Sequence, residues 1–394
     1  MPTQKSLQYS IWSILAFVCG VFFMLWTCLL VNVVHRRTTA TTIAAIDHAP
    51  STHFRGSRGN KALSFSPNKG TSPQRWFWIG MVRDAVEVPA STWDALAHAA
   101  CSPYQVHVHI VVGTNAAYAT DQLVTQRIAA TKQTAMKTMT KQCASVYIES
   151  EHDLGLGGDT PLPSNRVERI AMIRDAQRKR IKELYRQDDK QGTPSDLRNN
   201  IVIVADLDLF RLPPVTGVLA QADEIATHDA VDVVCAAGVT MASREELWYY
   251  DTYATVLLPD TYVHPLKRRL VKEYFPGEDH TLVRSDNQHG SFTQGDLMRY
   301  LQQQADTANT GTVQVRSCFG GLTIYRAATW LEPACRYSLP TDPETVRRLE
   351  RYASESDRRP CEHVVLHTCL QDVPSIRKAR IAINPHMLTL WRKN

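Results

Sequence analysis

The sequence predicts an α/β domain with a mostly parallel, Rossmann-like sheet, placed behind an N-terminal transmembrane helix. Two observations support this fold class. From residue 76 onwards, short β-branched or aromatic runs alternate with longer amphipathic segments, an order typical of a parallel sheet covered by helices on both faces. A separate apolar run near the N-terminus is long enough to cross a bilayer, which takes about 20 residues.

The composition is that of a globular protein. The chain has 394 residues, of which 44% are hydrophobic and 21% charged, and its formal net charge is +5. This length allows one large domain or two ordinary ones. Lys and Arg are spread along the chain, so the modest positive charge does not indicate a nucleic-acid-binding surface. We therefore expect no nucleic-acid partner.

The apolar run covers residues 11–34 and contains no charged residue. It is longer than the roughly 7–15 apolar residues of a signal peptide, and no clear small-residue cleavage site follows it. We interpret it as a retained signal anchor after a cytoplasmic tail at 1–10; a cleaved signal peptide is the alternative. Residues 35–75 are rich in Ser, Thr, Gly, Pro and basic residues, which predicts a flexible stem. The folded domain is then expected at 76–394, in a lumen.

The first half of the domain is predicted to alternate regularly between strands and helices. Strands are expected at residues 76–82, 105–112, 146–149 and 201–209. Helices are expected between them, at residues 91–100, 121–142 and 165–186. The first of these helices starts at Ser91–Asp94, which resembles a capping box.

The second half of the domain is less regular. An apolar strand is expected at 231–237, and another at 319–325, where a glycine pair precedes the apolar residues. Residues 285–316 are polar and are predicted to form a variable insertion. Helical patterns occupy 345–352 and 362–370.

The cysteines permit disulfides in the predicted lumenal domain. Of nine cysteines, two lie in the apolar run, so seven remain. Cys101 and Cys143 each precede a predicted strand and could bridge neighbouring strand starts. Cys335 with Cys361 is a second candidate pair. Because seven is odd, at least one thiol must be free.

The strongest chemical signal is the end of the strand at 201–209, which reads Ile-Val-Ile-Val-Ala-Asp-Leu-Asp-Leu. Its β-branched run predicts a strand buried on both faces. Asp206 and Asp208 follow at its carboxyl end, where open α/β sheets bind ligands. Carboxylates suit Mg²⁺ or Mn²⁺, which usually bind through one or two carboxylates plus substrate phosphates. We interpret the motif as a metal–diphosphate site; a strand-end turn with capping aspartates is the alternative.

A second enzyme class shares this motif. Haloacid-dehalogenase-type phosphatases also begin with an apolar strand and two aspartates in this spacing. They require Thr or Val two residues after the second aspartate, where this chain has Phe210. They also carry the motif at the start of their domain, whereas here it follows the predicted start by about 130 residues. These differences favour the metal–diphosphate interpretation.

Three arginines precede this strand on the predicted helix at 165–186: Arg166, Arg169 and Arg174. A guanidinium group can bind a diphosphate bidentately. Arg174 falls on the helical stripe of apolar residues, which consists of Val167, Ile170, Ala171, Ile181 and Tyr185. This position predicts an arginine that faces the interior, and an arginine at the edge of the stripe is the alternative.

Further candidates lie in the second half. Asp251 ends an aromatic cluster, Trp248–Asp251, in which rings could stack on a sugar and the carboxylate could bind its hydroxyls; core aromatics are the alternative. The pair Gly320 and Gly321 would let the backbone approach a ligand, or would mark a β-bulge. Glu362 begins a predicted helix, where a carboxylate is stabilised, and could act as a general base; an ordinary first-turn glutamate is the alternative.

Histidines offer a weaker metal signal. His363 and His367 have the i, i+4 spacing of a helical metal pair, but no glutamate of the zinc-protease type lies between them. His386 near the C-terminus is a candidate to complete the metal shell around the two aspartates, and a surface histidine is the alternative.

Several segments together resemble one family, the GT-A-type glycosyltransferases, and within it glycosyltransferase family 69, the group related to fungal capsule-associated α-1,3-mannosyltransferases. The matching segments occur in order along residues 76–390: Arg83-Asp84, residues 166–171 with Arg174-Asp175, Asp206-Leu207-Asp208, residues 235–238, Tyr250-Asp251-Thr252, residues 317–321, Cys361-Glu362-His363 and Ile383-Asn384-Pro385. Each segment is loose alone, and the series is fairly specific.

The resemblance implies a GT-A-like single domain in the Golgi or ER membrane, single-pass type II, with its catalytic domain in the lumen. It implies a nucleotide-sugar donor, with GDP-mannose favoured, Mn²⁺ or Mg²⁺, and a glycan or glycolipid acceptor. Arg83, Asp84 and the three helix arginines would bind the donor, Asp206 and Asp208 the metal and ribose, and Gly320 and Gly321 would form the glycine loop. Glu362 would lie on the acceptor side, and transfer would retain configuration. A non-catalytic carbohydrate-binding protein on the same fold is the alternative from another class.

Overall fold

The computed structural model describes residues 75–82, 88–113, 126, 129–130, 133, 143–157, 162–189, 197–241, 247–258, 261–262, 294–353, 359–372 and 378–391. The chain divides into two compact units, Met1–Ser66 and Pro67–Asn394, and all described residues belong to the second. The predicted tail and anchor, and the stem up to residue 74, lie outside the described residues. Within the described part, no helix has the length and apolar character needed to cross a membrane.

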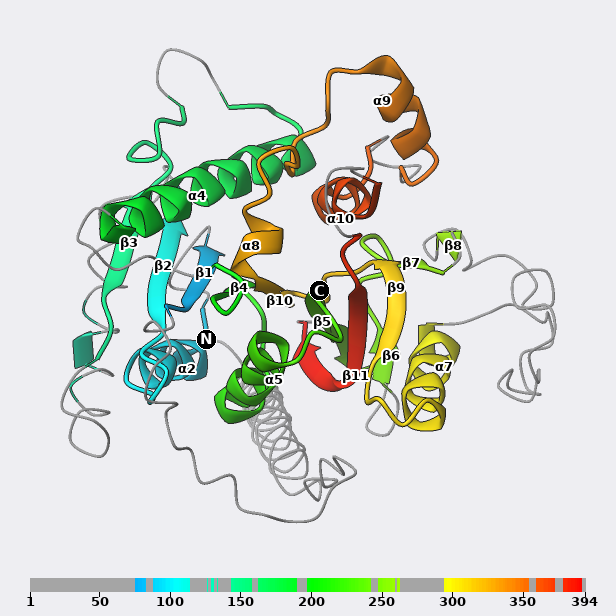
Figure 1. Ribbon diagram of the computed structural model, residues 1–394, viewed down its shortest axis with the longest axis horizontal. Coiled ribbons are helices and arrows are strands. Elements are labelled where there is room, and N and C mark those ends of the chain that lie inside the picture. The colour runs from blue at the N-terminus through cyan, green and yellow to red at the C-terminus, as the bar shows by residue number, and fades with distance from the viewer. Residues whose placement is uncertain are drawn as a thin grey trace, which may run out of the picture. The chain divides into compact units, whose positions relative to one another are not determined.

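One mixed β-sheet organises the domain (Figure 1). Along the chain its strands are β1 (Phe77–Val82), β2 (His107–Val112), β3 (Val146–Ser150), β4 (Ile201–Asp206), β5 (Val233–Met241), β6 (Leu247–Tyr249), β7 (Val256–Leu257), β8 (Thr261–Tyr262), β9 (Val313–Ser317), β10 (Leu322–Arg326) and β11 (Ile381–Leu390). In space the order is β3-β2-β1-β4-β10-β5-β11-β9-β7-β8, with β6 paired to β5.

The sheet changes character after β4. Strands β3, β2, β1 and β4 are parallel, as predicted for the first half. Strand β10 then enters antiparallel between β4 and β5, and only β11 is parallel to β5; β6, β7, β8 and β9 pair antiparallel. The expectation of a mostly parallel sheet is therefore wrong for the second half. A parallel pair needs a long crossover whereas antiparallel strands can be joined by short turns, and the regular alternation with helices ends after β5.

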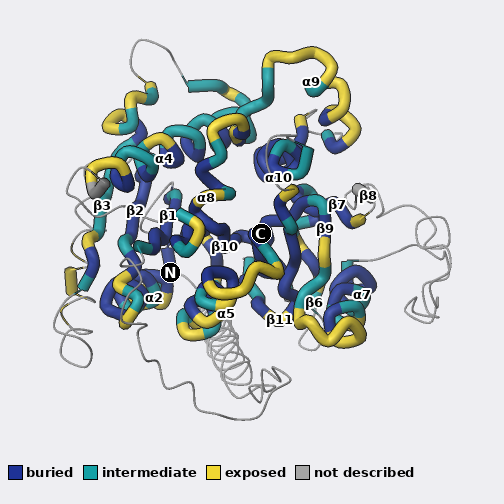
Figure 2. The backbone as a smooth tube through the Cα atoms, in the orientation of Figure 1, coloured by how far each residue is buried: buried dark blue, intermediate teal, exposed yellow. Residues whose placement is uncertain are grey.

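Helices cover both faces of the sheet (Figure 1). They are α2 (Ala90–Ala100), α4 (Arg166–Asp189), α5 (Val215–Thr227), α7 (Gln294–Thr307), α8 (Ala327–Trp330), α9 (Pro343–Glu350) and α10 (Glu362–Asp372). Residues of α4, α8 and α10 pack into one hydrophobic core, and residues of α2 and α5 into another. Figure 2 shows that the inner sides of these helices and the central strands are buried.

Strand β4 separates the two cores. Val202 and Val204 pack with the α4 side, whereas Ile201, Ile203 and Ala205 pack with the α2 side. The prediction of a strand buried on both faces is confirmed. Because successive side chains of a strand point to opposite faces, each of these residues enters a core, and burying a Val or Ile side chain stabilises the fold by about 1.5–3 kcal/mol.

Several boundaries differ from the prediction for identifiable reasons. Strand β4 ends at Asp206 rather than at residue 209, because a turn begins there. Strand β10 starts at Leu322 rather than at residue 319, because Gly320 and Gly321 have φ of +63° and +83°, outside the strand region. The predicted helix at 121–142 falls largely outside the described residues.

Several elements of the described domain were not predicted. The segment 285–316, expected to be an insertion, contains the amphipathic helix α7, whose Leu297, Met298 and Leu301 are buried, and most of strand β9. Helix α5 was not expected either, although its buried residues at 218, 219, 222, 225 and 226 follow helical spacing. Strand β11 contains Pro385, which argues against a strand; it is accommodated because the register shifts between Asn384 and Leu388.

Three disulfides hold the described domain. The predicted bridge between Cys101 and Cys143 is present. The other two join Cys235 to Cys318 and Cys335 to Cys369, while Cys361 is a buried free thiol. The predicted pairing of Cys335 with Cys361 is therefore wrong. Spacing along the chain could not choose between two partners that both lie on helix α10 or at its start.

We expect the double substitution Cys335→Ala and Cys369→Ala to lower the free energy of unfolding by about 3 kcal/mol, because it releases a constraint on the unfolded chain. Denaturant unfolding under non-reducing conditions measures this difference. Cys361→Ala is the matched control and should change stability much less, since it breaks no bridge. A disulfide-linked peptide containing Cys335 and Cys361 in a non-reducing digest would contradict the pairing.

Candidate active site

The two aspartates of the motif separate at the end of β4. The backbone N–H of Asp206 donates to the Gly321 carbonyl over 3.0 Å, so the strand end is tied to the glycine turn before β10. Leu207 and Leu209 are buried in the core on the α2 side, and they anchor the turn. Asp208, between them, is exposed. The turn therefore holds Asp206 partly inside the protein and directs Asp208 to solvent.

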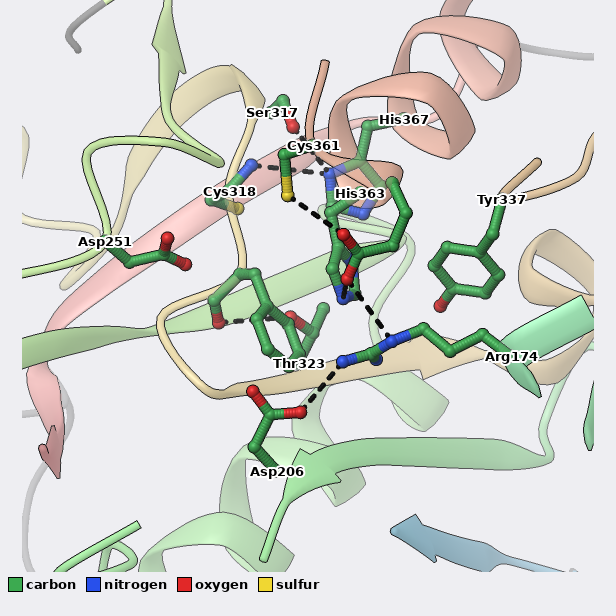
Figure 3. Close-up of polar contacts among 12 residues, drawn as sticks. Arg174, Asp206, Asp251, Ser317, Cys318, Thr323, Tyr337, Cys361, His363 and His367 are labelled. Carbon is green, nitrogen blue, oxygen red and sulfur yellow. Dashed lines mark hydrogen bonds and ion pairs between the residues drawn. The ribbon is translucent and has the colours of Figure 1, made fainter. Parts of the chain in front are cut away.

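Arg174 lies at the centre of the site (Figure 3). It is 2% exposed. Its Nη2 donates to Asp206 Oδ1 over 2.9 Å, and its Nε lies 3.4 Å from Glu362 Oε1. The guanidinium carbon lies 4.6 Å from the ring centre of Phe319 and 5.6 Å from that of Tyr337. One buried cation thus joins α4, the end of β4 and the start of α10. The prediction that Arg174 faces the interior is confirmed.

Neighbouring residues of α4 hold the loop that carries Tyr337. Asp175 accepts hydrogen bonds from the backbone N–H groups of Tyr337 and Ser338, over 2.8 and 2.9 Å. The Ser338 hydroxyl also donates to Asp175 over 2.7 Å. Arg178 donates to the carbonyls of Trp330, Glu332 and Cys335. These contacts fix the Tyr337 ring against the Arg174 guanidinium.

The glycine turn connects Asp206 to a second carboxylate. The Gly320 N–H donates to Asp251 Oδ2 over 2.8 Å, and the Thr389 hydroxyl donates to the Gly320 carbonyl. A Cβ at Gly320 would lie 2.0 Å from the carbonyl oxygen of Ala236. Glycine is therefore required here both by the positive φ and by the close backbone approach, and the turn directs the Gly320 N–H to the Asp251 carboxylate.

The site contains more negative than positive charge. The pKa of Asp206 is raised to about 7, mainly by burial and further by the charges of Asp208, Glu362 and Asp251, although Arg174 opposes the rise. Burial likewise raises the pKa of Asp251 to about 6, although the Gly320 N–H opposes the rise. Three carboxylates, Asp206, Asp251 and Glu362, thus share one guanidinium. Such a site favours binding of a further cation.

Of the three helix arginines, only Arg174 reaches the motif. Arg166 is the first residue of α4 and is exposed. Arg169 donates to both carboxylate oxygens of Glu151, over 3.0 and 2.7 Å. The predicted donor-binding roles of Arg166 and Arg169 therefore receive no support from their positions. Arg166 lies about two turns before Arg174 at the exposed start of the helix, and helical rotation directs Arg169 to Glu151. Arg83 and Asp84 lie outside the described residues.

The structure does not bring His386 into a metal shell with the aspartates. Among the described residues, no three His, Cys, Asp or Glu side chains are close enough together to hold a metal ion. His386 is exposed on β11, and its Nε2 lies 3.2 Å from Asp306 Oδ1. The surface alternative fits His386, because the register shift around Pro385 turns its side chain toward α7. Asp206 and Asp208 remain the candidate ligands, two residues apart at the end of β4.

Two pairs of aromatic groups at the site were not predicted as such. Phe319 and Tyr337 flank Arg174, and Tyr250 stacks on Trp391 with ring centres 4.8 Å apart. Tyr250 and Trp248 are 42% and 39% exposed, so two rings of the cluster predicted at Trp248–Asp251 are accessible to a ligand. By contrast Tyr249 is buried and bonded to Thr255, as the core alternative requires. No spacing rule relates residues 250 and 391, so only the fold could reveal this stack.

The i, i+4 histidine pair lies in the interior. His363 and His367 are both fully buried, and both contact the Tyr325 hydroxyl. Burial lowers the pKa of His367 to about 3, and burial together with Arg174 lowers the pKa of His363 well below its usual value. Both imidazoles are therefore neutral at physiological pH and serve as hydrogen-bonding groups.

No protein-family model and no curated protein sequence matches the chain. Among solved structures, similar chains include S. aureus TarS residues 1–349, at 11% identity and a TM-score of 0.36, covering 81% of this chain and 60% of that one. A mannosyltransferase from Pyrobaculum calidifontis, in complex with GDP-Man and Mn²⁺, has 11% identity and a TM-score of 0.32, covering 84% and 60%. M. tuberculosis glucosyl-3-phosphoglycerate synthase, with Mn²⁺, UDP and phosphoglyceric acid, has 10% identity and a TM-score of 0.28, covering 65% and 57%. The chain thus spans about three fifths of the length of these structures, and likeness this distant does not decide its activity.

We expect Gly320→Ala to lower the free energy of unfolding by roughly 3 kcal/mol or more, since the new Cβ meets the Ala236 carbonyl at a positive φ. Thermal and denaturant unfolding measure the change. Gly217→Ala in α5 is the matched control, because a Cβ there meets nothing within 4 Å; it should stabilise the helix by about 0.5–1 kcal/mol. Equal effects of the two substitutions would contradict the close approach.

The buried histidines predict a pH dependence of stability. The folded pKa of His367 is about 3, below its unfolded value near 6.5, so the unfolded chain binds the additional proton. The stability from the neutral ring is present above about pH 6.5 and is lost as pH falls toward 3, by up to about 1.4 kcal/mol per pH unit. Denaturant unfolding of the wild type and of His367→Gln between pH 7.5 and 5 tests this. The stability advantage of the wild type should shrink on acidification, and an advantage independent of pH would contradict the assignment.

Proposed function

We propose that the protein is a metal-dependent glycosyltransferase that moves a sugar from a nucleotide-sugar donor to an acceptor hydroxyl. The observation that carries the proposal is the fully buried Arg174, held between Asp206 of the strand-end motif and Glu362 at the start of α10. A guanidinium at the carboxyl end of a parallel strand lies where α/β sheets bind ligands. Near it lie the Asp206 carboxylate, which could bind a metal ion, the turn at Gly320 and Gly321, and the exposed Tyr250 ring.

The residues present fit a divalent cation. Asp206 and Asp208 supply hard oxygen ligands, and Mg²⁺ or Mn²⁺ typically uses one or two carboxylates together with substrate phosphates. The pKa of Asp206 is raised, so a bound cation would stabilise its ionised form. A bound ion would supply positive charge that stabilises the departing nucleoside diphosphate.

Side chains and backbone groups of the protein would position the substrates, exchange protons and add charge stabilisation. Arg174 would hold Asp206 and Glu362 in place and add positive charge near the diphosphate. Asp251, whose pKa is raised to about 6, could exchange a proton near neutral pH, and the Gly320 N–H fixes its orientation. Glu362 would face the acceptor. Tyr250 offers a ring on which the apolar face of a sugar can stack.

The proposal also specifies the donor, the stereochemistry and the acceptor of the reaction. A mannosyl donor, GDP-mannose, retention of configuration and a glycan or glycolipid acceptor are supported by the motif series that resembles glycosyltransferase family 69. Phe319 and Gly320 stand where that family often has Trp-Asn, so the donor is the feature that most needs measurement.

We also propose a Golgi or ER membrane location, with residues 11–34 as the anchor and the catalytic domain in the lumen. Three disulfides in the described domain support an oxidising compartment, because cytosolic proteins rarely keep disulfides. A glycosylation-reporter fusion at the C-terminus measures this topology.

The test is a thermal-shift panel of nucleoside diphosphates and nucleotide-sugars, with and without Mn²⁺, followed by a transfer assay. We expect a Mn²⁺-dependent shift with GDP or GDP-mannose, and sugar release above background. Asp208→Asn should abolish the Mn²⁺-dependent shift and lower turnover at least about 100-fold, yet leave the melting temperature of the free protein nearly unchanged, because Asp208 is exposed. His386→Gln is the control and should behave as the wild type, since its partner is Asp306.

Other outcomes distinguish the alternatives. Binding of a glycan without any nucleotide response or turnover would support a carbohydrate-binding protein. Hydrolysis of p-nitrophenyl phosphate that requires Asp206 would support the phosphatase alternative. Unchanged nucleotide response in Asp208→Asn would show that the metal role assigned to this aspartate is wrong.

A further inference from the structure

A chain of buried polar side chains lies directly behind Glu362. It consists of His363, Tyr325 and His367, all 0% exposed. The Tyr325 hydroxyl lies 2.8 Å from His367 Nε2 and 3.2 Å from His363 Nδ1. Figure 3 shows His363 and His367 on the inner side of α10, with His363 next to the Arg174 guanidinium. Polar groups buried this deeply must satisfy one another, and the proposed catalytic groups alone do not explain their presence.

At His367, the end of this group far from Glu362, the donors and acceptors of the hydrogen bonds are fixed. The Cys318 N–H lies 3.3 Å from His367 Nδ1 and can only donate, so that nitrogen must accept. The Ser317 hydroxyl lies 3.2 Å from the same nitrogen. A neutral imidazole carries one proton, which must then reside on His367 Nε2. That N–H donates to the Tyr325 oxygen.

At His363, the end next to Glu362, the contacts also favour a proton on Nε2. His363 Nε2 lies 3.8 Å from Glu362 Oε1 and has no hydrogen-bond partner. A proton on this nitrogen points at a carboxylate oxygen, whereas a lone pair there would face negative charge. With the proton on Nε2, His363 Nδ1 is free to accept from the Tyr325 hydroxyl. Two other hydroxyls, those of Tyr337 and Thr323, also interact with the Tyr325 hydroxyl. The Tyr337 oxygen already accepts from the Trp330 indole, and the Thr323 hydroxyl donates to the Phe319 carbonyl.

Glu362 is surrounded by donors on its protein side. Its Oε1 faces Arg174 Nε at 3.4 Å and His363 Nε2 at 3.8 Å, and both donors lack a hydrogen-bond partner. Its Oε2 accepts from the Cys361 thiol over 3.4 Å. The Phe319 ring stacks on His363 with centres 3.8 Å apart, which restricts rotation of the imidazole.

We propose that His363 is a positioning residue whose Nε2–H holds the Glu362 carboxylate beside Arg174, with its tautomer set by the relay from Cys318 N–H through His367 and Tyr325. The catalytic consequence rests on the proposed function, in which Glu362 faces the acceptor. A neutral donor suits this place, because a second buried cation beside Arg174 would be repelled. A carboxylate displaced by about 1 Å can cost up to about 100-fold in turnover.

The direct test is NMR of the imidazole nitrogens in deuterated full-length protein labelled with ¹⁵N-histidine. His363→Gln and His367→Gln assign the two ring systems. We expect both histidines to carry their proton on Nε2, and Glu362→Gln to move the His363 Nε2–H signal but not that of His367. Tyr325→Phe should turn His363 into a tautomer mixture. A proton on His363 Nδ1, as would result if Tyr325 donated to Tyr337 instead, overturns the proposal.

The kinetic test compares two substitutions of His363 that introduce a side-chain amide. In His363→Gln the side-chain nitrogen can reach the Nε2 position and keep a donor toward Glu362, whereas in His363→Asn it reaches only the Nδ1 position. We expect His363→Asn to lower kcat about 10–100-fold with little change in KM for the donor, and His363→Gln to retain most of kcat. Equal loss or equal retention in both variants, at comparable melting temperatures, overturns the proposal.

The experiments distinguish failure of the proposed function from failure of the positioning role of His363. If the wild-type chain transfers no sugar, the proposed function fails, and the NMR response of His363 to Glu362→Gln alone then decides whether the positioning contact exists. If transfer occurs and the tautomers are as expected but His363→Asn keeps full turnover, the proposed function stands and the positioning role does not.

Discussion

The ion pairs of the buried Arg174 guanidinium are the interaction on which the rest of the site depends. They join residues that are far apart along the chain, Asp206 and Glu362, and bring helix α4, strand β4 and helix α10 to one point. A cation that is 2% exposed is tolerated only when its charge is paired and its position fixed. The structure satisfies this constraint with two flanking rings and with the neighbouring residues Asp175 and Arg178, which hold the loop carrying one of those rings.

The same constraint explains the electrostatics. Burial is the main reason that the pKa values of Asp206 and Asp251 are raised, and the neighbouring carboxylates, which one cation does not balance, add to the rise. This imbalance costs stability in the free protein, and it makes the strand end receptive to a divalent cation with a diphosphate. The neutral histidines behind Glu362 fit the same logic, because they offer hydrogen-bond donors to a carboxylate without adding charge next to Arg174. Fold stability and the proposed chemistry therefore depend on the same few side chains.

Local patterns predicted the first half of the domain well. The β-branched run at 201–204 predicted a strand buried on both faces, and the apolar stripe of α4 predicted that Arg174 faces the interior. Patterns failed where tertiary contacts override local preference. Strand β11 tolerates Pro385 only because its register shifts there. Helix α7 reads as polar because only three of its buried residues, Leu297, Met298 and Leu301, are large and apolar. The same helical rotation that turns Arg174 inward directs Arg169 toward Glu151, and Glu151 could not be identified as a partner from spacing.

By itself the sequence determined that two aspartates follow a buried strand, that Arg174 faces the core and that a glycine pair precedes a later strand. Periodicity is a local property, and these features are local. Only the tertiary structure decided that the glycine turn bonds to Asp206 and Asp251, that Glu362 pairs with the same arginine, that Cys335 bonds to Cys369 and that His386 lies on the surface. Each of these depends on which residues are brought together by a mixed sheet in which β10 enters antiparallel between β4 and β5, and that strand order is set by packing across the whole domain rather than by any segment of the chain.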